Sequence, residues 1–289
     1  MAGLLLFNHV ARPFGLLEHY QTIKQKMNKS SLALLSALTV GALSVTAQTA
    51  PAPAPAAPSV AITVTPAIVS QYMFRGQRLG GASFQPAIEA SYGSFVGGLW
   101  SNFPVKDKVP GTSDPEFDFY GSYTAAISDT LSVVPGFTAF YYPDADTKAG
   151  FYKFTFEPSL AVNYTTSGIK FTPKIFYDFV LDGPTFELGA GYALPLKDLG
   201  TELGFSASIG TYLLNDFAKN STPRTKAWGD YWSVGVAAPF QLTKESKLTI
   251  GYAYTKGDGA YTKVGSAPKS ENTLAVGRGV VSVSYSYAF

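Results

Sequence analysis

The chain has 289 residues, of which 46% are apolar, 15% aromatic and only 15% charged. Soluble domains carry about 25% charged residues, so this composition argues against a surface that faces water on every side. Cysteine is absent, which excludes disulfides and thiolate metal sites. Residues 1–47 hold four of the 22 basic and one of the 20 acidic residues, so the remainder carries 18 basic and 19 acidic residues. That balance gives no basic excess to attract nucleic acid.

An export signal is predicted near the start of the chain. Met27-Asn28-Lys29 precedes an apolar run over residues 32–45, and Val45-Thr46-Ala47 supplies small residues for cleavage at its end. This pattern is typical of a signal peptide, and the run of 14 residues is shorter than the ~20 that a membrane anchor needs. We therefore expect a signal peptide at residues 27–47, preceded by an upstream extension at 1–26 that lies before the true initiator.

Residues 48–59 are rich in alternating Ala and Pro, which predicts an extended linker. Beyond the linker, apolar and polar side chains alternate with a period of two, which indicates strands. In residues 281–289, for example, five apolar or aromatic residues alternate with serines and one alanine. Each predicted strand has the length that a tilted strand needs to cross a bilayer, about ten residues or slightly more. Twelve strands are predicted, at 60–73, 84–93, 95–103, 115–127, 130–142, 150–165, 168–180, 184–195, 201–213, 229–240, 246–256 and 277–289.

The connections between these strands alternate between short and long. Short ones are expected at 93–94, 128–129, 167–168, 197–198 and 243–246. Long ones are expected at 74–83, 104–114, 143–149, 214–228 and 257–276, and only the Asp182-Gly183 turn breaks the alternation. Outer-membrane barrels have short turns on one side and long loops on the other.

The predicted fold class is therefore all-β, a transmembrane antiparallel up-and-down β-barrel over residues 60–289 in the outer membrane of a Gram-negative bacterium. In lipid every backbone amide must be paired, and closed barrels achieve this with strands. Proline cannot donate to a strand ladder, so prolines in or near the predicted strands leave the count open by two. These prolines are Pro66, Pro86, Pro135, Pro158, Pro173, Pro195 and Pro239.

Three motifs mark the first strands: Ser70-Gln71-Tyr72-Met73-Phe74-Arg75-Gly76, Gln85-Pro86-Ala87-Ile88-Glu89 and Gly98-Leu99-Trp100-Ser101-Asn102. Over residues 66–103 they resemble the TorF-like family of outer-membrane porins, formerly a conserved hypothetical family. The third motif is one residue tighter than the family's pattern. The resemblance implies an outer-membrane barrel and assigns no solute. The matching motif residues are Ser70, Tyr72, Phe74, Arg75, Gly76, Trp100, Ser101 and Asn102.

The last strand ends in Phe289, which resembles the signal that the barrel-assembly machinery recognises. The expected partners are therefore that machinery and outer-membrane lipid, with no nucleic acid, and a homo-oligomer is left open. Both histidines, His9 and His19, precede the predicted cleavage site. The mature chain therefore lacks the usual histidine base and histidine metal ligands. We expect no catalytic residue, metal site, cofactor or enzyme activity.

Charged residues on the predicted inner face could line a pore. An equally weighted alternative is that they pair and hydrogen-bond across a filled lumen. With six acids and three lysines, such a lining is predicted to favour the passage of cations. These residues are Glu89, Glu116, Asp118, Lys153, Glu157, Lys170, Lys174, Asp178 and Glu187.

Arg75 follows the first predicted strand, where a loop could fold inward and place it at a constriction. The favoured alternative is that Arg75 extends to the membrane interface or pairs with a carboxylate. Aromatic residues near strand ends are predicted to form the girdles found at bilayer interfaces. These are Tyr72, Trp100, Tyr141, Tyr142, Trp228, Tyr231 and Trp232.

The expected function is a passive diffusion channel for small hydrophilic solutes. Eight-stranded barrels are filled by side chains and those with 16–18 strands enclose an aqueous pore, so about twelve strands predict a narrow one. The alternative is a non-conducting barrel that serves as an adhesin, a structural anchor or a partner-binding platform through its long loops.

Overall fold

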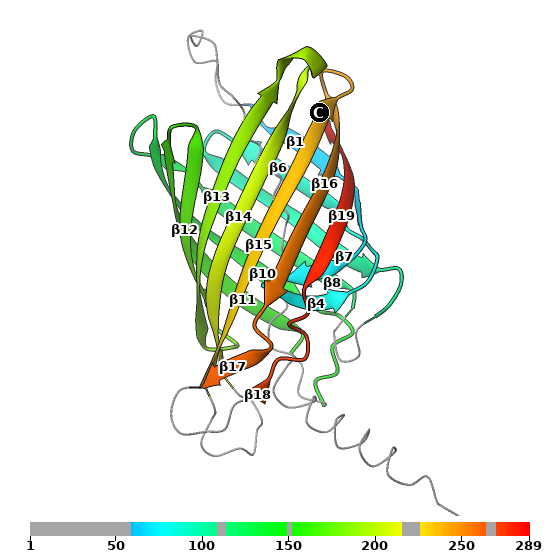
Figure 1. Ribbon diagram of the computed structural model, residues 1–289, viewed down its shortest axis with the longest axis vertical. Coiled ribbons are helices and arrows are strands. Elements are labelled where there is room, and N and C mark those ends of the chain that lie inside the picture. The colour runs from blue at the N-terminus through cyan, green and yellow to red at the C-terminus, as the bar shows by residue number, and fades with distance from the viewer. Residues whose placement is uncertain (1–58, 109–113, 149–151, 216–225, 264–269) are drawn as a thin grey trace, which may run out of the picture.

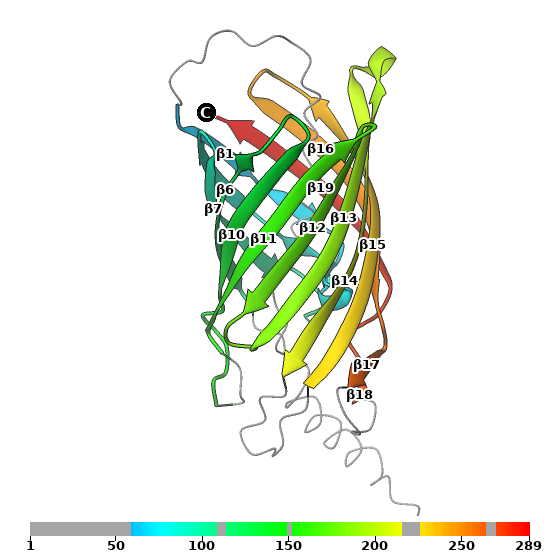
Figure 2. The same ribbon diagram turned by 90° about the vertical axis from the view of Figure 1, so that its left-hand side faces the viewer.

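The computed structural model describes residues 59–108, 114–148, 152–215, 226–263 and 270–289. The predicted upstream extension, signal peptide and all but the last residue of the linker lie outside these ranges. The described residues form a closed antiparallel β-barrel with twelve wall strands (Figures 1 and 2). Among them, no helix is long and apolar enough to cross a bilayer.

Three of the wall strands are broken into two pieces each. In chain order the wall consists of β1 (Ala61–Thr65) with β2 (Ala67–Val69), β5 (Ser83–Phe84) with β6 (Ala87–Tyr92), β7 (Phe95–Pro104), β8 (Glu116–Tyr123) with β9 (Ala125–Ala126), β10 (Leu131–Tyr141), β11 (Phe154–Thr166), β12 (Ile169–Asp178), β13 (Gly183–Leu196), β14 (Thr201–Asn215), β15 (Lys226–Gln241), β16 (Ser246–Gly257) and β19 (Arg278–Ala288). The remaining elements are β3 (Tyr72–Phe74), β4 (Gln77–Gly80), a 3-10 turn at Lys197–Leu199, β17 (Ala260–Lys263) and β18 (Ser270–Glu271).

The barrel closes where its first strand meets its last. β1 pairs with β6 on one side and with β19 on the other, with Thr63 opposite both Glu89 and Ala288. The Phe289 amide donates to the Ile62 carbonyl at 2.9 Å. Closure leaves the wall without an open strand edge.

Outward-facing positions are apolar around the whole wall. On β19, Val281, Val283 and Tyr285 are exposed, whereas Ser282 and Ser284 between them are half-buried on the inner face. Every wall strand carries at least one large apolar side chain that is exposed in the same way. An apolar surface of this extent is unfavourable in water and is the surface that a barrel presents to lipid.

The connections confirm the predicted alternation. The C-terminus and the short turns lie at one end of the barrel, and the strand ends that precede and follow the long connections lie, with β17 and β18, at the other (Figure 1). We call these the short-turn end and the loop end. Pro66 and Pro86 fall in the breaks between β1 and β2 and between β5 and β6, and the other five prolines lie within strands. The count of twelve is therefore unaffected.

One predicted strand was wrong at its end. The span 60–73 was expected to be continuous, but the wall strand stops at Val69 and the chain turns inward to form the β3–β4 hairpin. Tyr72, Met73 and Phe74 are successive large apolar residues, and all three are buried. A wall strand has one lipid face and one lumen face, so it buries alternate residues at most. A hairpin packed inside the barrel buries both of its faces.

Candidate functional site

The β3–β4 hairpin, residues 72–80, lies inside the barrel near the loop end, and we call it the lumen hairpin. Its two-residue turn has positive φ at Arg75 (43°) and Gly76 (74°), the conformation of a type I′ turn. The Gly257 amide at the end of β16 donates to the Gly76 carbonyl at 3.0 Å. A Cβ at position 76 would overlap the Gly257 backbone, so the turn requires glycine for space as well as for its backbone conformation.

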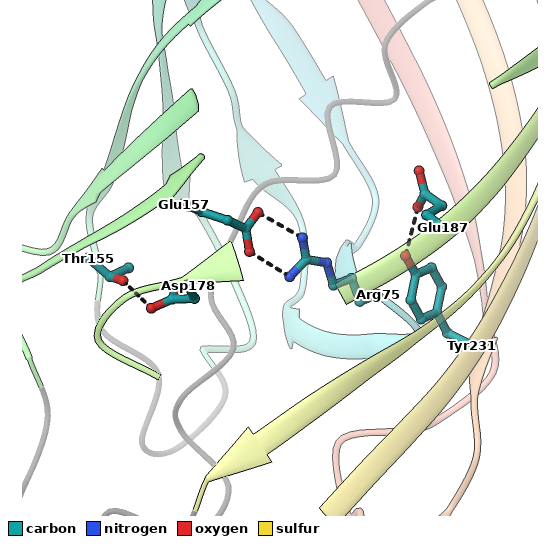
Figure 3. Close-up of polar contacts among 6 residues, drawn as sticks. All are labelled: Arg75, Thr155, Glu157, Asp178, Glu187 and Tyr231. Carbon is teal, nitrogen blue, oxygen red and sulfur yellow. Dashed lines mark hydrogen bonds and ion pairs between the residues drawn. The ribbon is translucent and has the colours of Figure 1, made fainter. Parts of the chain in front are cut away.

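Arg75 joins the hairpin to the wall through a bidentate ion pair. Its guanidinium donates to the two carboxylate oxygens of Glu157 on β11 at 2.8 and 3.0 Å (Figure 3). The guanidinium also lies 4.6 Å from the ring centroid of Phe74 and 4.9 Å from that of Phe176. Arg75 and Glu157 are both buried. Breaking such a pair by removing one partner typically costs about 3–5 kcal/mol, because the other charge stays buried.

Tyrosine hydroxyls hold the flanks of the hairpin. Tyr72 donates to one carboxylate oxygen of Glu116 at 2.7 Å, and Tyr142 donates to the other at 2.9 Å. Burial, followed by the charge of Glu116, raises the pKa of the Tyr72 phenol well above its ordinary value, so it stays protonated as a donor. On the opposite flank, the Gln77 side-chain amide donates to the Tyr212 hydroxyl at 3.0 Å.

Two glutamates face the lumen in a repeated three-strand arrangement. Glu89 on β6, Gly98 on β7 and Tyr120 on β8 lie in register, and the Tyr120 hydroxyl reaches across the glycine to donate to Glu89 at 3.0 Å. Glu187, Gly210 and Tyr231 repeat this arrangement on β13, β14 and β15, with a hydrogen bond of 2.7 Å (Figure 3). A Cβ at either glycine would overlap the tyrosine ring. Glycine therefore allows each ring to lie flat against the wall.

The predicted pore-lining residues fall into three environments. Glu116, Asp118, Glu157 and Asp178 point inward near the hairpin and are at most 4% exposed. Asp178 accepts from the Thr155 hydroxyl at 2.6 Å (Figure 3) and from two main-chain amides that follow β12, both at 2.8 Å. The half-buried inward group is Glu89, Lys170, Lys174 and Glu187.

Lys153 departs from the prediction. It precedes β11 on the loop side and its side chain is exposed. Lys153 lies outside the alternating segment, because β11 begins only at Phe154. The structure therefore does not bring Lys153 into either inward group.

The family-motif residues surround the lumen hairpin. Ser70 directly follows β2, and its hydroxyl accepts from the Val281 amide of β19 at 2.9 Å. Trp100 packs against Tyr72 with ring centroids 5.7 Å apart, and Ser101 is buried beside it. Asn102 is fully buried and accepts from the Gln85 side-chain amide at 3.0 Å. The motif thus encodes the hairpin and the wall that receives it.

The predicted aromatic girdle is wrong for four of its seven members. Tyr72, Trp100, Tyr142 and Tyr231 are at most 5% exposed and lie inside the barrel. Trp100 shares the inward face of β7 with Gly98, because both alternate with lipid-facing residues. Two further inward tyrosines, Tyr120 and Tyr212, were not predicted, although Gly98 and Gly229 lie opposite them and could have indicated them.

The inner face differs sharply between the two ends of the barrel. Around the hairpin, inward side chains such as Glu116, Thr155, Thr185 and Tyr212 are at most 3% exposed. We call this region the hairpin half. Toward the short turns, inward side chains are small or polar and keep some exposure, and we call this region the short-turn half. An inward side chain of a closed barrel retains exposure only where the lumen is not filled. Examples in the short-turn half are Ser122, Ser132, Asn163, Thr172, Ser206, Ser233 and Ser284.

Within the described ranges, no three acidic or histidine side chains are arranged to hold a metal ion. The lumen offers hydrogen bonding and charge.

Comparison with solved structures found barrels of low sequence identity. The NanC porin is 12% identical with a TM-score of 0.47, over 78% of this chain and 98% of that one. The KdgM porin in complex with disordered oligogalacturonate is 11% identical with a TM-score of 0.45, over 79% and 99%. The outer membrane protease OmpT from Escherichia coli is 12% identical with a TM-score of 0.32, over 80% and 96%.

No curated protein matches the sequence. A family model described as "Bacterial protein of unknown function (Gcw_chp)" matches residues 53–287. A match over this share of the sequence shows that the chain belongs to the Gcw_chp family.

Proposed function

We propose that the protein is an outer-membrane channel for small hydrophilic solutes, narrowed at its loop end by the lumen hairpin. The observation that carries this proposal is the contrast inside the barrel. A polar, partly exposed short-turn half leads to a hairpin that is built separately from the wall. Twelve strands suit such a narrow path, because eight-stranded barrels are filled and those of 16–18 strands are open.

The hairpin is suited to control permeability because it forms a sheet of its own. β3 and β4 pair only with each other among the described strands. Hydrogen bonds from the Gly257 amide to Gly76 and from the Arg78 amide to the Leu274 carbonyl join its backbone to the barrel. The other anchors described above are side-chain contacts. The hairpin can therefore move without breaking a wall ladder, on which the integrity of the barrel depends.

The apolar outward face of every wall strand supports a location in the outer membrane, surrounded by lipid. The motif resemblance to TorF-like porins supports the same location. The Phe289 ring packs edge-on against Tyr287 with ring centroids 4.8 Å apart. Phe289 remains 76% exposed, which leaves this residue accessible to the barrel-assembly machinery. The absence of histidine beyond His19 supports a non-enzymatic role.

The packing of the hairpin half favours a second candidate. If the hairpin never moves, the barrel does not conduct and serves as an adhesin, an anchor or a platform for a partner. The near-complete burial of Glu116, Thr155 and Tyr212 supports this alternative.

Planar-bilayer conductance of the refolded mature chain separates the two candidates. We expect small conductance steps from the native protein, and several-fold larger steps when residues 72–80 are replaced by an Asn-Gly turn. Removing residues 217–223 from the connection between β14 and β15 is the control, because it also shortens the chain by seven residues, and it should leave the steps unchanged. Heat-modifiable migration on a gel verifies that each barrel has folded. If neither the native nor the shortened barrel conducts, the channel is wrong and the non-conducting barrel stands.

A further inference from the structure

Most of the inward-facing acidic side chains are inaccessible to a solute. Four of the six acids lie in the hairpin half, at most 4% exposed, where their contacts are with the hairpin and the wall around it. Glu89 and Glu187 are closer to the open lumen, and each accepts a tyrosine hydroxyl across a glycine. The predicted preference for cations rested on counting these six acids equally.

The cations are arranged differently, along a single strand. Lys170 and Lys174 share the inward face of β12 with Phe176, and both lysines are half-buried. Four residues along a strand place their Cα atoms about 13 Å apart. The Lys174 Nζ lies 5.9 Å from the centroid of the Phe176 ring, and the Arg75 Cζ lies 4.9 Å from the centroid of the same ring. Lys170 and Lys174 thus follow one line from the short-turn half toward the hairpin, and we call them the basic track.

The two lysines of the track have no anionic partner in the part of the chain that the structure describes. The one ion pair within 4.0 Å there joins Arg75 and Glu157. Lys174 lies opposite Glu187 on β13, but the Glu187 carboxylate is hydrogen-bonded to Tyr231. The residues paired with Lys170, Thr165 and Gly191, are uncharged. Like charges held along one face repel one another unless an anion lies between them.

We infer that the channel prefers anions, and that small carboxylate- or phosphate-bearing solutes move along the basic track to the hairpin. Lysine ammonium groups on flexible stems provide exchangeable contacts for such groups. A row of weak sites favours entry without trapping the solute. This inference rests on the proposed channel and adds the charge of its solutes.

Reversal potentials in a KCl gradient test the inference with chloride as the probe. We expect the native protein to show a potential of anion-selective sign. The double variant Lys170→Gln/Lys174→Gln should lower the chloride-to-potassium permeability ratio by about sixteenfold, because removing two unit charges at roughly 10 Å in water disfavours chloride about fourfold and favours potassium about fourfold. The matched control is Lys106→Gln/Lys108→Gln, which removes two exposed lysines from the connection after β7. The control should leave the ratio unchanged.

The outcomes separate this inference from the proposed channel. Conductance with a cation-selective potential would overturn the inference and leave the channel intact. An unchanged ratio in the Lys170→Gln/Lys174→Gln variant would also overturn it, because the lysines would then not face the permeating ion. Absence of conductance in the native and hairpin-shortened proteins would overturn the channel itself. Inhibition of chloride conductance by added succinate, weakened in the same double variant, would extend the result to carboxylates.

Discussion

The hairpin half and the short-turn half of the lumen are enclosed by the same twelve strands, yet one is packed and the other is partly open. In the hairpin half, large inward residues such as Tyr212 and Trp100 meet the hairpin and are nearly inaccessible. In the short-turn half, the inward positions of β19 are Ser282, Ser284 and Ser286, and they keep some exposure. The free width of the lumen is therefore set by the side chains on the inner face as well as by the number of strands.

The halves also differ in what their polar groups do. In the hairpin half, Arg75, Glu116 and Glu157 hold the lumen hairpin in place through charge-assisted hydrogen bonds. In the short-turn half, Asn163 joins Ser132 and Thr172 into a row across three strands, with hydrogen bonds of 3.2 and 3.1 Å. Such neutral contacts line the wall without closing the lumen. Substitutions in the two halves should therefore have very different consequences.

The largest effect is expected from Glu157→Gln. It leaves the Arg75 charge buried without its carboxylate, so the free energy of hairpin opening should fall by about 3–5 kcal/mol. Hydrogen exchange of the amides of residues 72–80 measures this free energy. Glu89→Gln is the matched change nearer the short turns, and it should leave exchange of the hairpin amides unaltered.

The double variant Arg75→Met/Glu157→Leu sharpens that result. Replacing a buried ion pair by apolar residues is often neutral or stabilising, so protection of the hairpin should return toward the native value. Equal loss in the single and double variants would show that packing, rather than the uncompensated charge, determines how firmly the hairpin is held.

Gly76→Ala should be the next most disruptive change. The alanine would have to adopt a positive φ, and its Cβ would overlap the Gly257 backbone, at a cost of roughly 1–3 kcal/mol. Fluorescence of Trp100, which packs against Tyr72, reports docking of the hairpin once the two outward tryptophans, Trp228 and Trp232, are changed to Phe.

Two control glycines divide this effect into its parts. Gly200 has a positive φ of 62° with no atom near its absent Cβ, and Gly259 has neither constraint. Gly200→Ala should therefore show a small loss of barrel stability with unchanged Trp100 fluorescence, and Gly259→Ala should show no change. A Gly76→Ala variant that behaves like Gly200→Ala would indicate that contact with β16 does not hold the hairpin.

Tyr72→Phe should weaken the hairpin less, by about 1.5 kcal/mol, because it removes one hydrogen bond to a charged acceptor. Tyr142 still donates to Glu116 in this variant, so the carboxylate keeps a partner. Trp100 fluorescence compares docking of the hairpin in the native protein and in the variant, and identical docking in the two would contradict the prediction.

The two regions were also unequally predictable from the sequence. The wall followed from alternation, because lipid and lumen select opposite side chains at successive positions of each strand. The hairpin did not follow from the sequence, because Tyr72, Met73 and Phe74 are strand-forming residues that look like a continuation of the first wall strand. Nor did the sequence reveal that Trp100 faces inward, since a girdle and a packed hairpin both use aromatic residues near strand ends. Partners such as Arg75 and Glu157, 82 positions apart, depend on the curvature of the closed wall, which alternation alone does not specify.

The smallest effect is expected from Ser284→Ala in the short-turn half. Ser284 is a half-buried inward residue of β19, and trimming a hydroxyl that faces open lumen should change the free energy of unfolding by less than about 0.5 kcal/mol. Thr155→Ala is its counterpart in the hairpin half, where the hydroxyl donates to buried Asp178 at 2.6 Å, and it should cost about 1–3 kcal/mol. Urea unfolding of the refolded proteins in micelles compares the two. If both variants lose the same stability, the short-turn half is packed as tightly as the hairpin half, and solutes have no open entrance from that end.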